Sequence, residues 1–95
     1  MHVGEDEAIL AWLTDGHLRE RILLALTQPL TAAQLARKIH CTQRECRRCL
    51  AALLNRRLVF CLNPLASSSR LYWVRPLGVE CQVTLKRALQ YSRPP

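Results

Sequence analysis

The chain has 95 residues, and 49% of them are apolar, which is enough for one small helical core. We expect residues 1–95 to form a single domain. Its 14 Lys and Arg against 7 Asp and Glu leave a net charge of +7 at pH 7. An excess of positive charge of this size favours a polyanionic partner.

The positive charge is concentrated in one part of the chain. Residues 37–75 contain nine Lys and Arg and a single acid, Glu45. The first twenty residues reverse this balance, with five acids and one cation, Arg19. A chain charged in this way has a basic binding side, and its affinity for phosphate is expected to fall steeply with salt.

Several classes of protein are excluded by simple features. No run approaches the roughly eighteen apolar residues of a membrane helix, and residues 1–7 lack the basic and apolar regions of a signal peptide. We therefore expect a cytoplasmic protein that binds no membrane, with its five cysteines reduced. No nucleophile with its base, no spaced pair of acids and no phosphate-binding glycine loop is recognisable. We predict neither enzymatic activity nor a cofactor.

Two helices are predicted at the start of the chain. Residues 5–13 form a short acidic segment with an apolar side. A second helix is expected from residue 17 to 26 or 27, with Asp15 as its N-cap, and Pro29 follows its end. The residues of this helix that are spaced four apart and predicted to face the core are Leu18, Ile22 and Leu26.

Two helix-start signatures of one type lie eleven residues apart. Thr31 and Thr42 are each expected to cap a helix, while Gln34 and Glu45, three residues later, bond back to the backbone N–H of the threonine. Each start also has an apolar staple pair, Leu30 with Leu35 and Cys41 with Cys46. Since the first helix spans only about 32–39, the two helices meet across a short turn and form a helix-turn-helix.

The second helix of this motif, about residues 43–56, is predicted to be apolar on one side and basic on the other. At 100° per residue, its core-facing residues are Cys46, Leu50 and Leu53, with Cys49 at the margin. Its outward residues are Arg44, Arg47, Arg48 and Ala51. In the DNA major groove arginine bonds guanine and glutamine bonds adenine, so Gln43 and these arginines are candidate readers of bases. A solvated charged surface is the alternative.

An extended pattern replaces the helical one after this helix. Residues 58–62 and 70–75 are rich in β-branched and aromatic residues and are predicted to pair as a hairpin across a serine-containing loop. Pro76 is expected to begin a last helix over about 77–91. Residues 92–95 are predicted to be unstructured.

This order of four helices, two strands and a final helix resembles winged-helix transcription regulators of the ArsR and MarR type. The matching stretch is about residues 18–78, and three motifs carry the resemblance. They are Leu30-Thr31-Ala32-Ala33-Gln34-Leu35-Ala36, Leu50-Ala51-Ala52-Leu53-Leu54-Asn55-Arg56-Arg57-Leu58-Val59 and Tyr72-Trp73-Val74-Arg75-Pro76-Leu77-Gly78. The resemblance implies a mainly α-helical winged helix-turn-helix with a small β-hairpin. His40 and Arg57 depart from the family pattern, because glycine is usual at both positions and supports a positive φ.

The resemblance also implies binding of double-stranded DNA as a transcriptional regulator. The recognition helix, about 43–56, would enter the major groove, and the wing, about 58–75, would contact the backbone or the minor groove. Thr42 matches a helix-start residue that holds a phosphate. Arg70 matches a wing cation, with a simple strand-edge charge as the alternative. The candidate DNA-binding residues are Thr42, Gln43, Arg44, Arg47, Arg48, Ser68 and Arg70. Arg56 and Arg57 are expected to complement the helix dipole instead.

Two other functions stay open at this point. A winged helix can be a protein-interaction module whose basic face meets an acidic protein. The spacing Cys41-x4-Cys46-x2-Cys49, with Cys61 and Cys81 further on, is similar to zinc and iron-sulfur ligand spacings and suggests a metal or redox sensor. We favour plain packing of these cysteines and predict no metal, because buried free cysteine behaves as a small hydrophobe.

The terminal segments carry more apolar surface than a small core needs. These apolar residues are Trp12, Leu13, Val79, Val83 and Leu89. Winged-helix regulators often dimerise through such elements, so we predict a homodimer formed by helices 5–13 and 77–91, with coverage of a monomer's core as the alternative. The sequence does not identify a small-molecule or metal effector.

Overall fold

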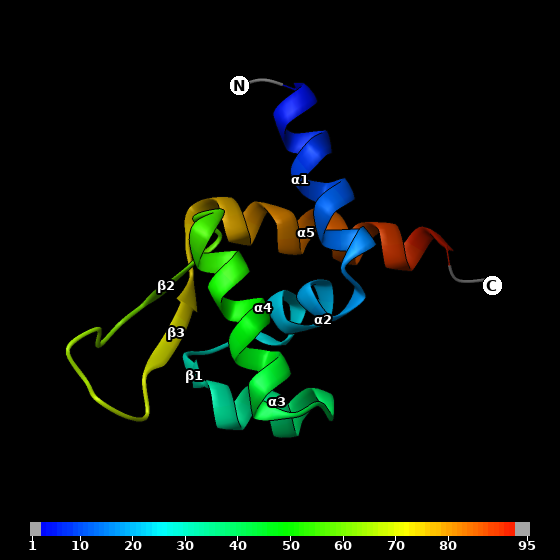
Figure 1. The fold of residues 1–95 in the computed structure, drawn as a ribbon. Helices are drawn as coiled ribbons and strands as arrows, with labels where there is room; N and C mark the ends of the chain where they lie inside the picture. Colours follow the sequence, from blue (N-terminus) through cyan, green and yellow to red (C-terminus); the bar gives the residue numbers. More distant parts are fainter. Residues whose placement is uncertain (1–2, 93–95) are drawn as a thin grey trace.

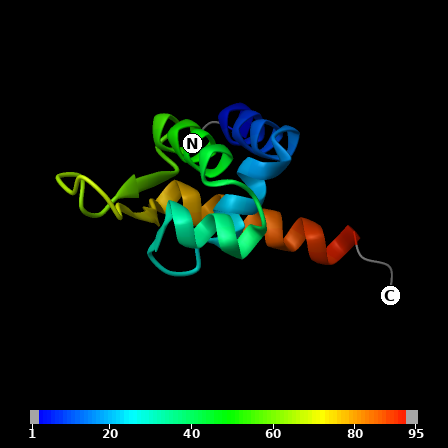
Figure 2. The same ribbon diagram turned by 60° about the horizontal axis from the view of Figure 1, so that its bottom comes forward.

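The computed structural model describes residues 3–92 and the side chains of residues 7–90. The elements in chain order are α1 (Val3–Asp15), α2 (His17–Ala25), β1 (Leu30–Thr31), α3 (Ala32–Ile39), α4 (Gln43–Asn55), β2 (Val59–Cys61), β3 (Leu71–Val74) and α5 (Pro76–Ser92). The β2-β3 hairpin and the C-terminal part of α5 point in opposite directions from the central helices (Figure 1, Figure 2). This is the predicted mainly α-helical winged helix, with one strand more than expected. Of the tail predicted to be unstructured, Ser92 ends α5 and residues 93–95 lie outside the described residues.

Both predicted capping boxes are present, and they determine where α3 and α4 begin. The Oγ1 atoms of Thr31 and Thr42 accept from the backbone N–H of Gln34 and Glu45, each at 3.1 Å. The reciprocal bonds, from the threonine N–H to the Gln34 and Glu45 side chains, measure 2.9 and 3.2 Å. The turn between the two helices passes through His40 at φ 60°, so the expected left-handed residue is confirmed.

The sheet has three antiparallel strands in the order β1-β3-β2, whereas two were predicted. Leu30 pairs with Tyr72, and Thr31 pairs with Leu71. A strand of two residues shows no periodicity, and its partner lies some forty residues further on, so no local pattern predicts it. This strand fastens the start of α3 to the wing.

The start of the chain differs from the prediction in two ways. Helix α1 runs from Val3 to Asp15 rather than over 5–13, and only Gly16 separates it from α2. Asp15 is not the cap of α2, because it is the last helical residue of α1 and Gly16 takes the N-cap position without a side-chain bond. A Cβ at Gly16 would overlap the guanidinium group of Arg19, so the glycine makes room for this side chain.

The core lies between the helices and the inner face of the sheet. Its fully buried large side chains are Leu13, Ile22, Leu23, Leu26, Leu35, Cys46, Leu50, Leu53, Leu58 and Val59. The buried amide of Gln82 on α5 donates to the carbonyls of Leu23 and Leu26 at 2.8 and 2.9 Å, which ties α5 to the end of α2. Among the described residues, no helix has the length and apolar character needed to cross a bilayer. The cytoplasmic location stays a prediction.

Candidate nucleic-acid interface

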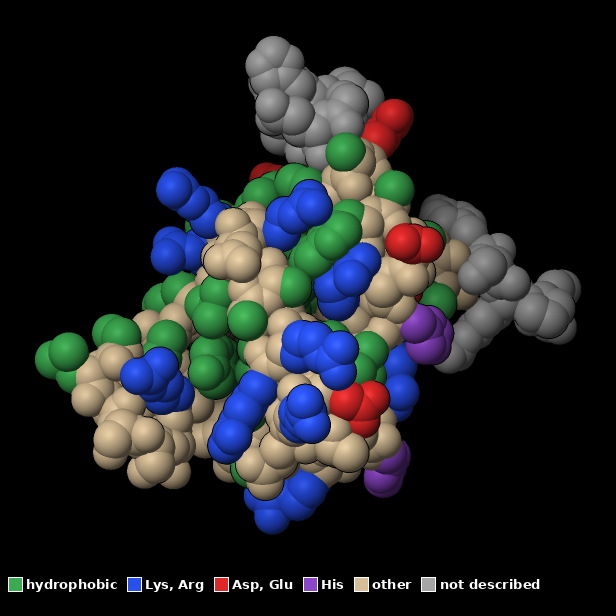
Figure 3. All heavy atoms as spheres, in the orientation of Figure 1, with side chains coloured by type: hydrophobic (Ala, Val, Ile, Leu, Met, Phe, Trp, Pro, Cys, Tyr) green, Lys and Arg blue, Asp and Glu red, His purple; other side chains and the backbone are tan. Residues whose placement is uncertain are grey.

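Helix α4 presents the face that its sequence pattern predicts. Cys46, Leu50 and Leu53 are buried against α2 and α3, and Cys49 is half-buried at the margin. The exposed residues at its start and along its outer face are Thr42, Gln43, Arg44, Arg47, Arg48 and Ala51. Figure 3 shows Lys and Arg side chains spread over this side of the molecule. The predicted outward direction of these arginines is confirmed.

No carboxylate among the described side chains neutralises the arginines of this face. Among the side chains that the structure describes, Arg44, Arg47 and Arg48 form no ion pair, and Arg47 Nη2 donates to Gln43 Oε1 at 3.4 Å. The acid of this segment, Glu45, is held by the cap. Hydrogen bonds from the hydroxyl and backbone N–H of Thr42 lower the pKa of Glu45, and Arg48 adds a smaller effect. The outer side of α4 therefore keeps an unbalanced positive charge.

The wing is a hydrogen-bonded loop organised by one side chain. Asn63 Oδ1 accepts from the backbone N–H of Leu71 at 2.7 Å, and Asn63 Nδ2 donates to the carbonyl of Ser69 at 3.3 Å. Arg57, at the second position where the family pattern has glycine, has φ 59°. Ser69 has φ 53° and is a further left-handed residue, which the sequence did not indicate. Arg70 Nε donates to the carbonyl of Ala66 at 2.9 Å, which orients its guanidinium group along the wing.

A groove separates the wing from the helix-turn-helix. Its polar and aromatic lining residues are Thr31, Gln43, Arg47, Ser67, Ser68, Ser69, Arg70 and Tyr72, with Ala32 and Ala33 beside them. Four of the seven candidate residues, Gln43, Arg47, Ser68 and Arg70, are thus brought together. Thr42, Arg44 and Arg48 do not line the groove. Tyr72 and the start of α3 are there because β1 pairs with β3, the contact that sequence reasoning missed.

Comparison with solved structures finds regulators of one family. A MarR-family transcription regulator superposes with a TM-score of 0.67 and 25% identity, over 90% of this chain and 63% of that one. Staphylococcus aureus MarR, in complex with salicylate and kanamycin, gives 0.63 and 19% over 93% and 68% of the two chains. A MepR mutant from a multidrug-resistant S. aureus clinical isolate gives 0.54 and 15% over 83% and 63%. No family model and no curated protein matches the sequence.

The chain has the MarR winged-helix fold. It spans 63% of the length of the first of these neighbours, so it is shorter than they are. The neighbours are transcription regulators, a class of proteins that is not enzymatic. Of the two regulator types that the sequence resembles, ArsR and MarR, the solved structures support the MarR type. The prediction that the chain is not an enzyme agrees with the class of these neighbours.

Several cations of this winged helix have partners within the molecule and are set apart from the groove. Lys38 Nζ donates to the carbonyl of Ala25 at 2.8 Å and so closes the end of α2. Arg56 stacks over the ring of Trp12, with its Cζ 4.5 Å from the centroid, and Arg19 lies 4.1 Å from the same centroid. Arg56 thus joins the end of α4 to α1, a role beyond the predicted complement of the helix dipole.

The cysteines of the helix-turn-helix pack as the predicted staple. Cys46 is fully buried, and burial together with the neighbouring thiols raises its pKa to about 12, with Cys41 in contact. Burial also raises the pKa of Cys49. In the part of the chain that the structure describes, no group of three His, Cys, Asp or Glu side chains is placed to hold a metal ion. The burial of Cys46 fits the predicted role of a small hydrophobe in the staple, and the absence of a metal stays a prediction.

Proposed function

We propose that this chain is a DNA-binding transcriptional regulator. Helix α4 lies in the major groove, and the wing rests on the backbone or in the minor groove. The observation that carries the proposal is the groove in which Gln43 and Arg47 of α4 face Ser68 and Arg70 of the wing. The fold that the chain shares with MarR-family regulators supports it.

The positions of the side chains suggest a division of roles. Gln43 and Arg47 lie one helical turn apart and are joined by a hydrogen bond, so both can address base edges from the groove side of α4. Arg44 and Arg48 lie outside the groove, where contacts to phosphates are the simpler expectation. Thr42 and the first turn of α4 provide backbone N–H groups and a positive dipole end beside them.

The test begins with duplexes selected by the purified protein from a random pool. The double substitution Arg44→Ala and Arg48→Ala removes two cations from the proposed face. Fluorescence anisotropy at several salt concentrations should then show weaker binding and a slope of log K against log salt that is flatter by about two units. The matched control removes two exposed cations of α5 by Lys86→Ala and Arg87→Ala and should leave the slope nearly unchanged.

Two outcomes contradict the proposal. Wild-type protein without salt-dependent duplex binding would favour the alternative of an interaction module for an acidic protein. If the double variants of α4 and of α5 lost equal amounts of duplex affinity, the binding would be a non-specific attraction by net charge alone.

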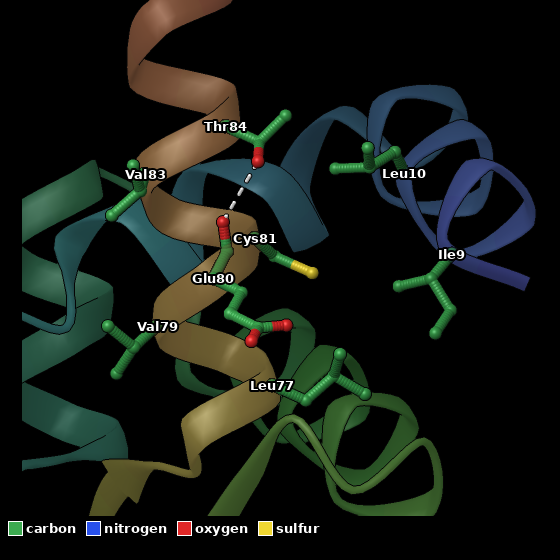
Figure 4. Close-up of a pocket in the computed structure, with 8 residues that line it drawn as sticks. All are labelled: Ile9, Leu10, Leu77, Val79, Glu80, Cys81, Val83 and Thr84. Atoms are coloured by element: carbon green, nitrogen blue, oxygen red, sulfur yellow. Dashed lines mark hydrogen bonds between the residues drawn. The ribbon is translucent and has the colours of Figure 1, made fainter. Parts of the chain in front are cut away.

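We further propose that the regulator is a homodimer formed through α1 and α5. On α5, Val79 and Val83 remain 44% and 45% exposed, and they line an open groove with Ile9 and Leu10 of α1 (Figure 4). Leu89, also predicted for this surface, is 46% exposed further along α5. Sedimentation at micromolar concentration should show a dimer, and Val83→Glu should weaken it. A monomeric wild-type protein would contradict this proposal.

One residue predicted for the dimer surface, Leu13, does not belong to it, because it is fully buried in the core. Trp12 is half-buried, and the guanidinium groups of Arg19 and Arg56 lie over its ring. Part of the apolar surface of Trp12 is therefore covered within the chain. The apolar side of the first segment is divided between α1's own packing and the groove with α5.

A further inference from the structure

One large apolar side chain of this protein is almost wholly in water. Leu65 is 99% exposed, whereas Leu62, Val79, Val83 and Leu89 are each less than half exposed. It lies in the wing loop that connects β2 to β3, and hydrophobic side chains are visible at the far end of this loop (Figure 3). The core does not reach this loop, so neither packing nor the fold accounts for a leucine there.

The wing holds Leu65 outward in a defined conformation. Pro64 and Leu65 are the central residues of a turn closed by the bond from the N–H of Ala66 to the carbonyl of Asn63, at 3.0 Å. The proline ring restricts the backbone, and the side chain of Asn63 braces the opposite side of the loop through Ser69 and Leu71. The backbone that carries Leu65 is therefore ordered before binding and loses little conformational entropy when the side chain binds.

The surroundings of Leu65 match a polyanion with an apolar interior. Residues 46–79 contain no Asp or Glu. Arg70 donates to the carbonyl of Ala66, the residue next to Leu65, so a guanidinium group lies close to the exposed leucine. Serine hydroxyls of residues 67–69 line the adjacent groove. Duplex DNA combines outer phosphates with an apolar stack of bases, and minor-groove proteins insert leucine or proline between base steps.

We infer, on the basis of the proposed function, that Leu65 backed by Pro64 is a wedge that enters the minor groove beside the α4 site. The side chain partly unstacks one base step and bends the duplex, while Arg70 contacts the flanking backbone or groove. Pyrimidine–purine steps unstack most easily, so the wing selects such a step at a position that α4 does not contact. The wedge therefore contributes sequence preference through deformation of the DNA.

The test uses the selected duplex with fluorophores at its ends, to report bending, and 2-aminopurine at the step under the wing. Wild-type protein should shorten the end-to-end distance and increase 2-aminopurine emission. Leu65→Ser should abolish both signals and weaken binding about tenfold, the contribution of one buried leucine, with an unchanged salt slope because no phosphate contact is lost. Leu65→Met should retain the bend. Leu62→Ser, the same change in the same wing, is the matched control and should bend DNA like wild type.

The outcomes separate this inference from the proposed function. Salt-dependent binding by the wild type without a bend, or a Leu65→Ser variant that bends and binds like wild type, overturns the wedge alone. Altered sedimentation of Leu65→Ser with unchanged DNA binding overturns it too, since Leu65 would then meet a second copy of the chain. Absence of duplex binding by the wild type overturns both. Thermal unfolding of the two Leu65 variants should match that of wild type, because Leu65 is outside the core.

Discussion

Gly78 allows a close approach between the last helix and the root of the wing, which is formed by Leu58 and Arg75. It lies in the first turn of α5, is buried, and faces the carbonyl group of Leu58 just before β2. That carbonyl also accepts from the N–H of Arg75 at 2.9 Å. A Cβ at position 78 would overlap the Leu58 oxygen and lie 3.2 Å from its carbonyl carbon and 3.4 Å from Val74 Cβ. Gly78→Ala must therefore move α5 away from the wing root.

The expected loss of stability follows from three opposing effects. Alanine in a helix gains about 0.5–1 kcal/mol over glycine. Overpacking costs about 1–3 kcal/mol, and a weakened bond from Arg75 to Leu58 costs about 1 kcal/mol. The net loss is about 1–3.5 kcal/mol, which lowers Tm by roughly 4–28 °C for a domain of this size. Thermal unfolding followed by circular dichroism measures it, with Thr84→Ala, exposed on the same helix, as the control. An alanine variant as stable as wild type, or more stable, would refute the close approach.

Three further predictions concern the cap, the ring stack and the buried thiol. Because hydrogen bonds from Thr42 lower the pKa of Glu45, its ionised form stabilises the fold above its unfolded-state pKa, and this stability is lost as pH falls below about 4. Urea unfolding should show that the free energy of unfolding falls less on acidification for Glu45→Gln than for wild type. An equal fall in both proteins would contradict this role of Glu45. Trp12→Leu should cost about 0.5–2 kcal/mol, and a double-mutant cycle with Arg56→Gln should show coupling rather than additivity. Iodoacetamide at pH 8 should label Cys46, whose pKa is about 12, only after unfolding, and rapid labelling of the native protein would be evidence against its burial.

The parts of the fold that were predicted correctly depend on contacts within one or two helical turns. Thr31 and Thr42 each form their cap with residues three positions away, so both helix starts can be read locally. The buried side of α4 follows from helical periodicity for the same reason. The positive φ at His40 was expected from the family pattern, because a short turn between helices requires a left-handed residue.

The parts that were missed depend on contacts between distant segments. Strand β1 exists only because β3 pairs with it, and Tyr72 reaches the groove through this pairing. The apolar side of the first segment was visible, but its periodicity does not tell the core from a partner. Leu13 lies in the core because α1 continues to Asp15 and packs on α2. The wing's bracing by Asn63 likewise involves residues up to eight positions apart and has no periodic signature.

The proposed function requires that the outer face of α4 and the facing side of the wing form the surface that meets DNA. An NMR titration of isotope-labelled protein with its selected duplex tests it residue by residue. We predict that amide and arginine side-chain shifts concentrate at residues 42–48 and 67–70, while residues 79–90 of α5 change little. Shifts centred on α5, or none in α4 at saturating duplex, would contradict it.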